Sequence, residues 1–248
     1  MQCVQFQLTI EEITMNIIST PTSINEIIFG NPASKILIND IIKGIKPFPS
    51  NGKTGILLYG VNGTGKTTLA RLLPDAIEQQ KTGNKAVRPD VNFVSCDSVN
   101  ATKTVKSTKH QANDVSVFLN NSGYHYFILD EIDTWTAPQQ ADLKGALNST
   151  QAIFILTTNN IGSLNRGILD RCHKVEMNAA SSQQLLPLAK QVISSFNVAI
   201  TDVELKEFID ENCEGSIRSL ANDVPDFARS LERAATKKAA ADKRKAKK

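Results

Sequence analysis

The octapeptide Gly-Val-Asn-Gly-Thr-Gly-Lys-Thr, residues 60–67, constrains the fold of this chain more than any other segment. Its glycines allow tight backbone turns that residues with a side chain resist. The apolar run GILLY precedes it at 55–59, and TTLARLL follows it with the apolar spacing of a helix. Strand, glycine-rich loop and helix in this order predict the opening of an α/β unit.

The loop follows the pattern Gly-x4-Gly-Lys-Thr, which is typical of loops that bind the phosphates of a nucleotide. Its backbone N–H groups can surround the phosphates, and the amino terminus of the following helix adds favourable partial charge. A glycine-rich turn without a ligand is the alternative, and the flanking strand and helix argue against it. The predicted nucleotide-binding residues are Gly60, Val61, Asn62, Gly63, Thr64, Gly65, Lys66, Thr67 and Thr68.

Two side chains of this loop have separate chemical roles. The ammonium group of Lys66 is expected to reach the β- and γ-phosphates, so we predict that it serves catalysis as well as binding. Thr67 is expected to offer its hydroxyl oxygen to Mg²⁺. The implied cofactors are ATP and Mg²⁺.

Short apolar runs and helical patterns alternate through the first two thirds of the chain. Continuous apolar runs of four to six residues indicate strands that are buried on both faces, as in a parallel sheet. The predicted architecture is therefore an α/β three-layer sandwich with a parallel sheet. The expected strands are 55–59, 91–94, 126–129 and 153–156, and helical patterns cover 35–46, 67–80, 114–119 and 137–147.

Carboxylates follow the third of these strands, in the segment YFILDEID at 126–133. Asp130 lies where a carboxylate that holds Mg²⁺ is expected. Glu131 is expected to accept a proton from the water that attacks the nucleotide. We interpret Asp133 as a cap of the next helix. Acidic residues at strand ends are common, and it is the glycine-rich loop that makes this motif informative.

The fourth strand also ends in polar residues, in the segment FILTTNN at 154–160. The carboxyl ends of neighbouring parallel strands face the same crevice. Asn159 is therefore a candidate to hydrogen-bond the γ-phosphate or the attacking water. Its alternative role is that of a turn residue.

Strand patterns stop after residue 179, and a helical module is expected. Ser181 and Ser182 can cap a helix that runs to about residue 196, and Thr201 with Glu204 forms a predicted capping box for a second helix. A third helix is expected to begin near Ser216 and to bend or break at Pro225. The predicted domains are an α/β nucleotide-binding domain (1–178), a helical lid (179–232) and a basic, frayed tail (233–248).

Charge is distributed unevenly along the chain. Residues 236–248 contain seven of the 28 Lys and Arg residues and one of the 25 Asp and Glu residues, so this tail carries +6 and the remainder −3. Basic tails often bind nucleic acid, and a solvated helix end without a partner is the alternative.

Composition excludes several other classes of protein. The four cysteines lie far apart without a Cys-x2-Cys pair, which argues against a zinc site or a disulfide framework and favours a reducing compartment. No signal peptide is evident, and no apolar run approaches the roughly 18 residues that span a membrane. The expected location is the cytoplasm, or the host cytoplasm if the chain is viral, without a membrane partner.

In this order, the motifs resemble those of the AAA+ ATPases, and within them the small subunits of sliding-clamp loaders, cellular or phage. The resemblance covers residues 25 to about 230 and implies an ATPase. NEIIFGNP at 25–32 is similar to the family's adenine-side segment, which assigns Ile28 and Phe29 to nucleotide binding. FILTTNN resembles sensor 1 and assigns that role to Asn159.

Two arginines acquire catalytic roles from the same resemblance. ILDRC at 168–172 is similar to the Ser-Arg-Cys arginine-finger motif, which assigns the finger to Arg171. Asp170 replaces the serine of that motif, and its carboxylate is an alternative partner that could hold Arg171 in a local salt bridge and limit its reach. GSIRSLAND at 215–223 resembles the sensor 2 helix, so Arg218 is expected to bind nucleotide and to act in catalysis from the lid.

The resemblance further implies a homo-oligomer or AAA+ hetero-oligomer, a ring or arc, that acts on DNA in replication. Lys103, Lys106 and Lys109 fall on one side of a segment that faces DNA in this family; an ordinary solvated face is the alternative. A sliding clamp or a helicase is a candidate partner. We expect no counterpart of the collar domain of clamp-loader subunits in this sequence. Other readings are a helicase loader, a transposition-type AAA+ regulator, a protein remodeller or an inactive structural subunit.

Overall fold

A computed structural model describes residues 19–86, 88–95 and 120–245 of the chain. The chain divides into two compact units, one of residues Pro21–Asn178 and one that includes Ala179–Lys248. The predicted helix at 114–119 and the predicted DNA-binding residues Lys103, Lys106 and Lys109 lie outside the described residues.

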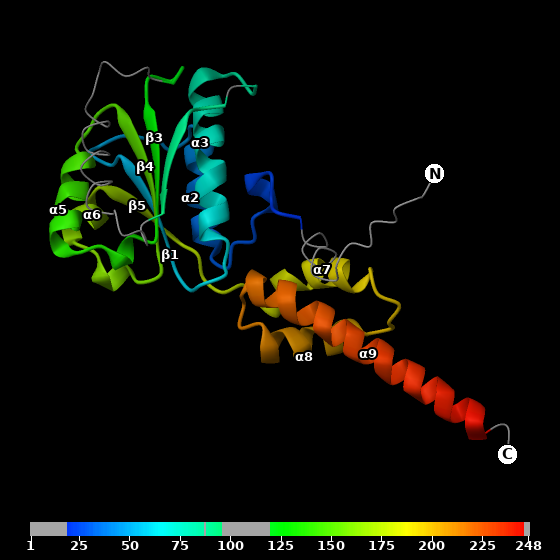
Figure 1. The fold of residues 1–248 in the computed structure, drawn as a ribbon. Helices are drawn as coiled ribbons and strands as arrows, with labels where there is room; N and C mark the ends of the chain where they lie inside the picture. Colours follow the sequence, from blue (N-terminus) through cyan, green and yellow to red (C-terminus); the bar gives the residue numbers. More distant parts are fainter. Residues whose placement is uncertain (1–18, 87, 96–119, 246–248) are drawn as a thin grey trace, which may run out of the picture. The chain divides into compact units, whose positions relative to one another are not determined.

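A parallel sheet of five strands forms the centre of the first unit, in the order β2-β3-β4-β1-β5 (Figure 1). All four predicted strands are present, and the predicted parallel sheet is confirmed. Its strands are β1 (Gly55–Tyr59), β2 (Val91–Ser95), β3 (His125–Asp130), β4 (Ala152–Thr158) and β5 (Cys172–Glu176).

The fifth strand, β5, is absent from the sequence prediction. Its sequence, CHKVE, buries only Cys172 and Val175, since β5 lies at the edge of the sheet next to β1. The central strand β4, by contrast, is buried at every position. A continuous apolar run therefore identifies the central strands and misses this edge strand, in which polar residues separate the two buried ones.

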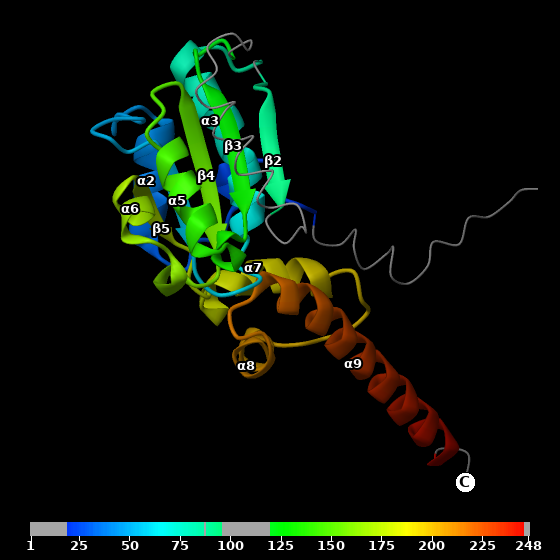
Figure 2. The same ribbon diagram turned by 60° about the vertical axis from the view of Figure 1, so that its left-hand side comes forward.

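Helices cover both faces of this sheet (Figures 1 and 2). On one face lie α2 (Pro32–Ile42) and α3 (Lys66–Thr82), and on the other lie α5 (Ala137–Ala146) and α6 (Arg166–Asp170). Alternate residues of β1 serve the two cores: Ile56 and Leu58 pack with the α2 and α3 side, and Leu57 packs with the α5 and α6 side. The three-layer sandwich predicted from the alternating pattern is confirmed.

A buried carboxylate fixes α3 against β3 at the end of the helix remote from the glycine-rich loop. Glu78 is fully buried, and it accepts hydrogen bonds from the Tyr126 hydroxyl (2.8 Å) and the Ser122 N–H (2.9 Å). Burial raises the pKa of Tyr126 above its usual range, so its hydroxyl stays a donor. The helix that is anchored in this way begins at Lys66, the lysine of the glycine-rich loop.

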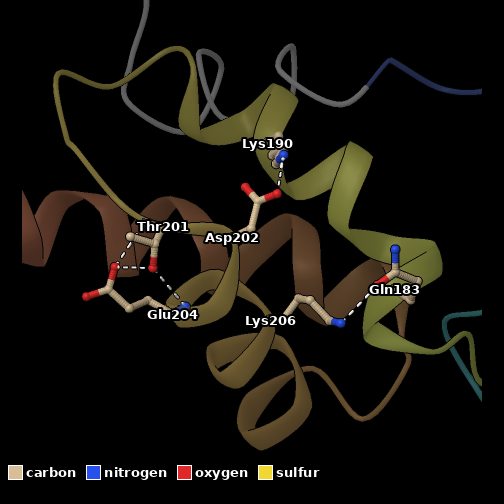
Figure 3. A network of polar contacts seen from close by, with 6 residues as sticks. All are labelled: Gln183, Lys190, Thr201, Asp202, Glu204 and Lys206. Atoms are coloured by element: carbon tan, nitrogen blue, oxygen red, sulfur yellow. Dashed lines mark hydrogen bonds and ion pairs between the residues drawn. The ribbon is translucent and has the colours of Figure 1, made fainter.

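The second unit consists of α7 (Ser182–Ile193), α8 (Asp202–Asn212) and α9 (Ile217–Lys245). Both predicted caps are confirmed, and each forms a full capping box: Ser181 with Gln184 and Thr201 with Glu204. Polar contacts join α7 to α8 at the surface, as Figure 3 shows; these are Lys190 to Asp202 (2.7 Å) and Lys206 to Gln183 (2.9 Å).

Helix α9 differs from the prediction in two respects. It does not end at Pro225, and it continues through Lys245, so the described part of the expected frayed tail is helical. A proline inside a helix costs about 3 kcal/mol. Full burial of Leu220, Val224 and Ala228 on the same helix offsets that cost. Beyond the core, alanine, lysine and arginine are strong helix formers and extend the helix without an apolar stripe.

None of the helices that the structure describes is both long enough and apolar enough to cross a membrane.

Candidate active site

The glycine-rich loop joins β1 to α3 and requires glycine at specific points. Gly60, Gly63 and Gly65 all have positive φ angles, of 141°, 77° and 88°. A Cβ atom on Gly60 would lie 2.3 Å from the carbonyl oxygen of Met177, so no side chain fits there. Gly65 is the N-cap of α3 and provides no side-chain cap, which leaves the first N–H groups of this 17-residue helix available to an anion.

Lys66 is 8% exposed and folds back over the loop. Its Nζ donates hydrogen bonds to the carbonyl oxygens of Gly60 (2.9 Å) and Val61 (2.7 Å). A full positive charge is thereby held at the loop whose N–H groups would face phosphate. Charge and donors together fit a polyphosphate group.

Thr67 and Asp130 meet at the carboxyl end of the sheet. The Thr67 hydroxyl lies 3.0 Å from Asp130 Oδ1 and 3.1 Å from Asp130 Oδ2. A hydroxyl and a carboxylate are oxygen ligands of the kind that Mg²⁺ prefers, usually together with water and substrate phosphates. The pair therefore fits the predicted metal site.

Glu131 follows Asp130 in a left-handed backbone conformation, with φ 60° and ψ 51°. This conformation costs a residue with a side chain roughly 1–2 kcal/mol. Two threonines hold it: the Glu131 N–H donates to Thr157 Oγ1 (2.9 Å), and the Glu131 carbonyl accepts from Thr134 Oγ1 (3.0 Å). The exposed Glu131 carboxylate is left able to accept a proton.

Asp133 has a different role from the predicted helix cap. Helix α5 is capped by Thr136, which forms a capping box with Gln139. Asp133 Oδ1 instead accepts hydrogen bonds from the Thr158 hydroxyl (3.1 Å) and the Asn159 N–H (3.3 Å). The carboxylate thus joins the loop after β3 to the end of β4.

Asn159 lies beside the glycine-rich loop. Its neighbour Thr158 pairs with Tyr59, the residue before Gly60, so β4 and β1 end at the same level. The side chain of Asn159 is half-buried. Its predicted role as sensor of the γ-phosphate stays a prediction, and this position is compatible with it.

Arg171 lies at the amino end of β1, whereas the glycine-rich loop of the same chain follows the carboxyl end of this strand. It precedes Cys172, which pairs with Gly55 at the amino end of β1. Its Nε donates to Asn148 Oδ1 (2.7 Å) and a terminal guanidinium nitrogen donates to the Gly167 carbonyl (2.8 Å). The alternative salt bridge with Asp170 is not present among the described residues, and these two neutral oxygens orient the guanidinium instead.

The remaining predicted residues occupy different environments. Phe29 is buried among the apolar residues beneath α2 and α3, and Ile28 is half-buried beside it. Arg218 is exposed in the first turn of α9, in the second unit. The roles of all three in nucleotide binding stay predictions.

One residue that contacts the site was not predicted from the sequence. Thr157 bonds both Asp130 and Glu131, although it lies in the segment FILTTNN, where only Asn159 was singled out. The signal that could have identified it is register, since β4 runs parallel beside β3 and Leu156 pairs with Leu129.

A glycine-rich loop between β1 and α3, with Asp130 and Glu131 at the carboxyl end of the parallel strand β3, defines a P-loop nucleoside triphosphatase. Residues 56–179 match the family described as "ATPase family associated with various cellular activities (AAA)", and the chain belongs to this family. It is an ATPase with a nucleotide-binding α/β unit and a helical C-terminal region.

Two relatives are named as subunits of DNA polymerase III and of replication factor C. The chain is 23% identical over 175 residues to DNA polymerase III subunit gamma of Buchnera aphidicola subsp. Baizongia pistaciae, covering 65% of this chain and 47% of the relative. It is 21% identical over 210 residues to replication factor C large subunit of Natronomonas pharaonis, covering 82% of this chain and 39% of the relative. The chain therefore spans less than half the length of either relative.

Solved structures of Thermotoga maritima RuvB have a similar fold. One variant superimposes with a TM-score of 0.62 at 17% identity, covering 88% of this chain and 67% of RuvB. A second, named as the Holliday junction branch migration motor, gives a TM-score of 0.60 at 18% identity, covering 83% of this chain and 63% of RuvB. At this level of identity the likeness concerns the fold alone.

Nucleotide binding is expected to depend on Lys66. Lys66→Ala removes the charge held over the loop, and we expect ATP affinity, measured by calorimetry, to fall at least about tenfold, as for a lost charge-assisted contact. Lys85→Ala, at an exposed lysine beyond α3, is the matched control and should bind like the parent. Equal affinity of the Lys66 variant and the control would disprove the assignment of the loop.

Proposed function

We propose that this chain is a subunit of an oligomeric, Mg²⁺-dependent ATPase that acts on DNA in the manner of a clamp-loader subunit. The observation that carries the proposal is the position of Arg171, one strand length away from the loop of its own chain. An arginine finger placed there serves a neighbouring subunit. The names of the two relatives support replication as the setting.

Within one subunit, the proposed chemistry uses groups that converge at the carboxyl ends of β1, β3 and β4. Lys66 and the N–H groups of the loop hold the β- and γ-phosphates, and Thr67 with Asp130 holds Mg²⁺. Mg²⁺, when bound, neutralises charge on the phosphate oxygens. Glu131 accepts the proton of the attacking water, and Asn159 orients that water or the γ-phosphate.

Two arginines complete the proposed mechanism from outside this group. Arg171 of one subunit reaches the γ-phosphate bound by its neighbour, where a planar, permanently charged group can bind phosphate oxygens with two donors. Arg218 responds to nucleotide from the helical unit. Ile28 and Phe29 contact the base.

DNA is the proposed partner because cationic groups cluster in two segments of the chain. Lys103, Lys106 and Lys109 are one proposed contact. The end of α9 is a second, and it exposes Arg233 and Lys237. Cations of this kind bind phosphates without sequence preference and in a salt-dependent way.

Other AAA functions share this site chemistry. A helicase loader or a transposition-type regulator would also act on DNA as an oligomer. A protein remodeller is less well supported, since such proteins present an aromatic pore loop after the second strand and residues 96–119 are rich in lysine and threonine, with a single aromatic residue, Phe118. A sliding clamp or a helicase is the proposed protein partner.

The ATPase rate should rise several-fold when primed DNA is added, because DNA would organise the neighbouring sites. Light scattering with ATP should give a mass that is a multiple of 27.1 kDa, or a stable hetero-assembly when partner subunits are supplied. An unfolded polypeptide in place of DNA is the control for a remodeller. A monomer whose rate responds to polypeptide and not to DNA would contradict the proposal.

A further inference from the structure

The hydroxyl of Thr157 is a point of contact between the two acidic residues proposed for hydrolysis. Thr157 lies in β4 and is 1% exposed. Its Oγ1 donates a hydrogen bond of 2.5 Å to Asp130 Oδ1 and accepts one of 2.9 Å from the Glu131 N–H. The single hydroxyl proton goes to a carboxylate, so this is a charge-assisted bond of the stronger kind.

The two bonds have different consequences. Asp130 is held from two sides, by Thr157 at Oδ1 and by Thr67 at both oxygens. Rotation of the carboxylate would break the Thr157 bond, so its orientation toward Thr67 is defined. Oδ2 has no bond from Thr157, which leaves it the less engaged oxygen for a cation.

The bond to Glu131 acts on the backbone. Glu131 has a left-handed conformation that a residue with a side chain adopts at a cost, and its N–H points back to β4. Without an acceptor there, this partly buried N–H would be unpaired. The hydroxyl therefore helps to keep the turn that carries the Glu131 carboxylate away from the strand.

We infer that Thr157 is a positioning residue for ATP hydrolysis, which orients the Asp130 carboxylate for the cation and holds Glu131 in its left-handed turn. The inference rests on the roles proposed above for Asp130 and Glu131. Thr157 itself touches neither nucleotide nor water in this role. An ordinary strand threonine would stabilise the fold and leave the cation dependence unchanged.

Thr157→Val and Thr157→Ser test the inference, because valine keeps the shape and loses the hydroxyl, whereas serine keeps the hydroxyl. We expect kcat of Thr157→Val to fall about 10- to 100-fold, as for one charge-assisted hydrogen bond, with little change in KM. Calorimetry should show unchanged nucleotide affinity without Mg²⁺ and a smaller gain on adding Mg²⁺. Thr157→Ser should recover most of both properties.

Thr54→Val is the matched control, since Thr54 is also a buried threonine, directly before β1, and donates to a neutral acceptor, the Leu147 carbonyl (2.7 Å). It should lower the melting temperature and leave the gain from Mg²⁺ unchanged. If Thr157→Val does not fold, Thr157→Ala compared with Thr157→Ser gives the same test.

Two results would overturn the inference: parental kcat and Mg²⁺ dependence in Thr157→Val, or equal impairment of the serine and valine variants. Asp130→Asn and Glu131→Gln, measured in parallel, separate this failure from failure of the proposed site. If those two lose turnover and Thr157→Val does not, only the role of Thr157 is wrong. If those two retain turnover, the proposed site is wrong.

Discussion

Glu131→Gln is expected to retain ATP binding and to lose turnover by about 10²–10⁴-fold, as for removal of a general base. Glutamine has the size of glutamate and can hydrogen-bond, but it does not accept the proton of the attacking water. The turn should persist, because the contacts that hold it come from the backbone of residue 131 to Thr157 and Thr134. Steady-state phosphate release and calorimetric ATP affinity measure the two properties.

The matched control is Glu207→Gln, at an exposed glutamate of α8 in the second unit, which should hydrolyse ATP like the parent. We also expect any assembly that requires bound ATP to last longest in the Glu131 variant, since its nucleotide is not consumed. Parental turnover in Glu131→Gln would show that another group activates the water.

Arg171→Ala is expected to bind ATP normally and to hydrolyse it about 10³–10⁵-fold more slowly, the range found for arginine fingers. Asn148 and Gly167 hold the guanidinium near the amino end of β1, away from the loop of its own chain, which follows the carboxyl end. Loss of activity from that distance points to a neighbouring subunit. Arg166→Ala, at the exposed first residue of the short helix α6 that ends just before Arg171, is the matched control.

Mixing Arg171→Ala with Lys66→Ala tests the geometry directly. In mixed assemblies, some interfaces combine an intact loop from one variant with an intact Arg171 from the other, so activity should return in part. Co-assembly is verified by light scattering. If verified mixed assemblies stay inactive, Arg171 acts within its own subunit or only in the structure.

Local chemistry made much of this protein predictable. A loop such as residues 60–67 needs its glycines and its lysine regardless of the rest of the chain. Its role, and the strand and helix on either side, could therefore be predicted from adjacent residues alone. The same is true of the capping box of Thr201 and Glu204. The central strands were also predictable, because burial on both faces leaves a continuous apolar run.

Tertiary structure decided the features that depend on distant residues. Strand β5 exists because it pairs with β1, and Pro225 is tolerated in α9 because its neighbours on that helix are buried. Asp133 binds the end of β4 instead of capping α5, and Arg171 is oriented by Asn148 instead of Asp170. The sequence alone determined which groups can bind nucleotide and accept a proton. Strand order and register join residues far apart in the chain. They decided that Thr157 bonds both acidic residues and that Arg171 lies at the opposite end of the strands from the loop.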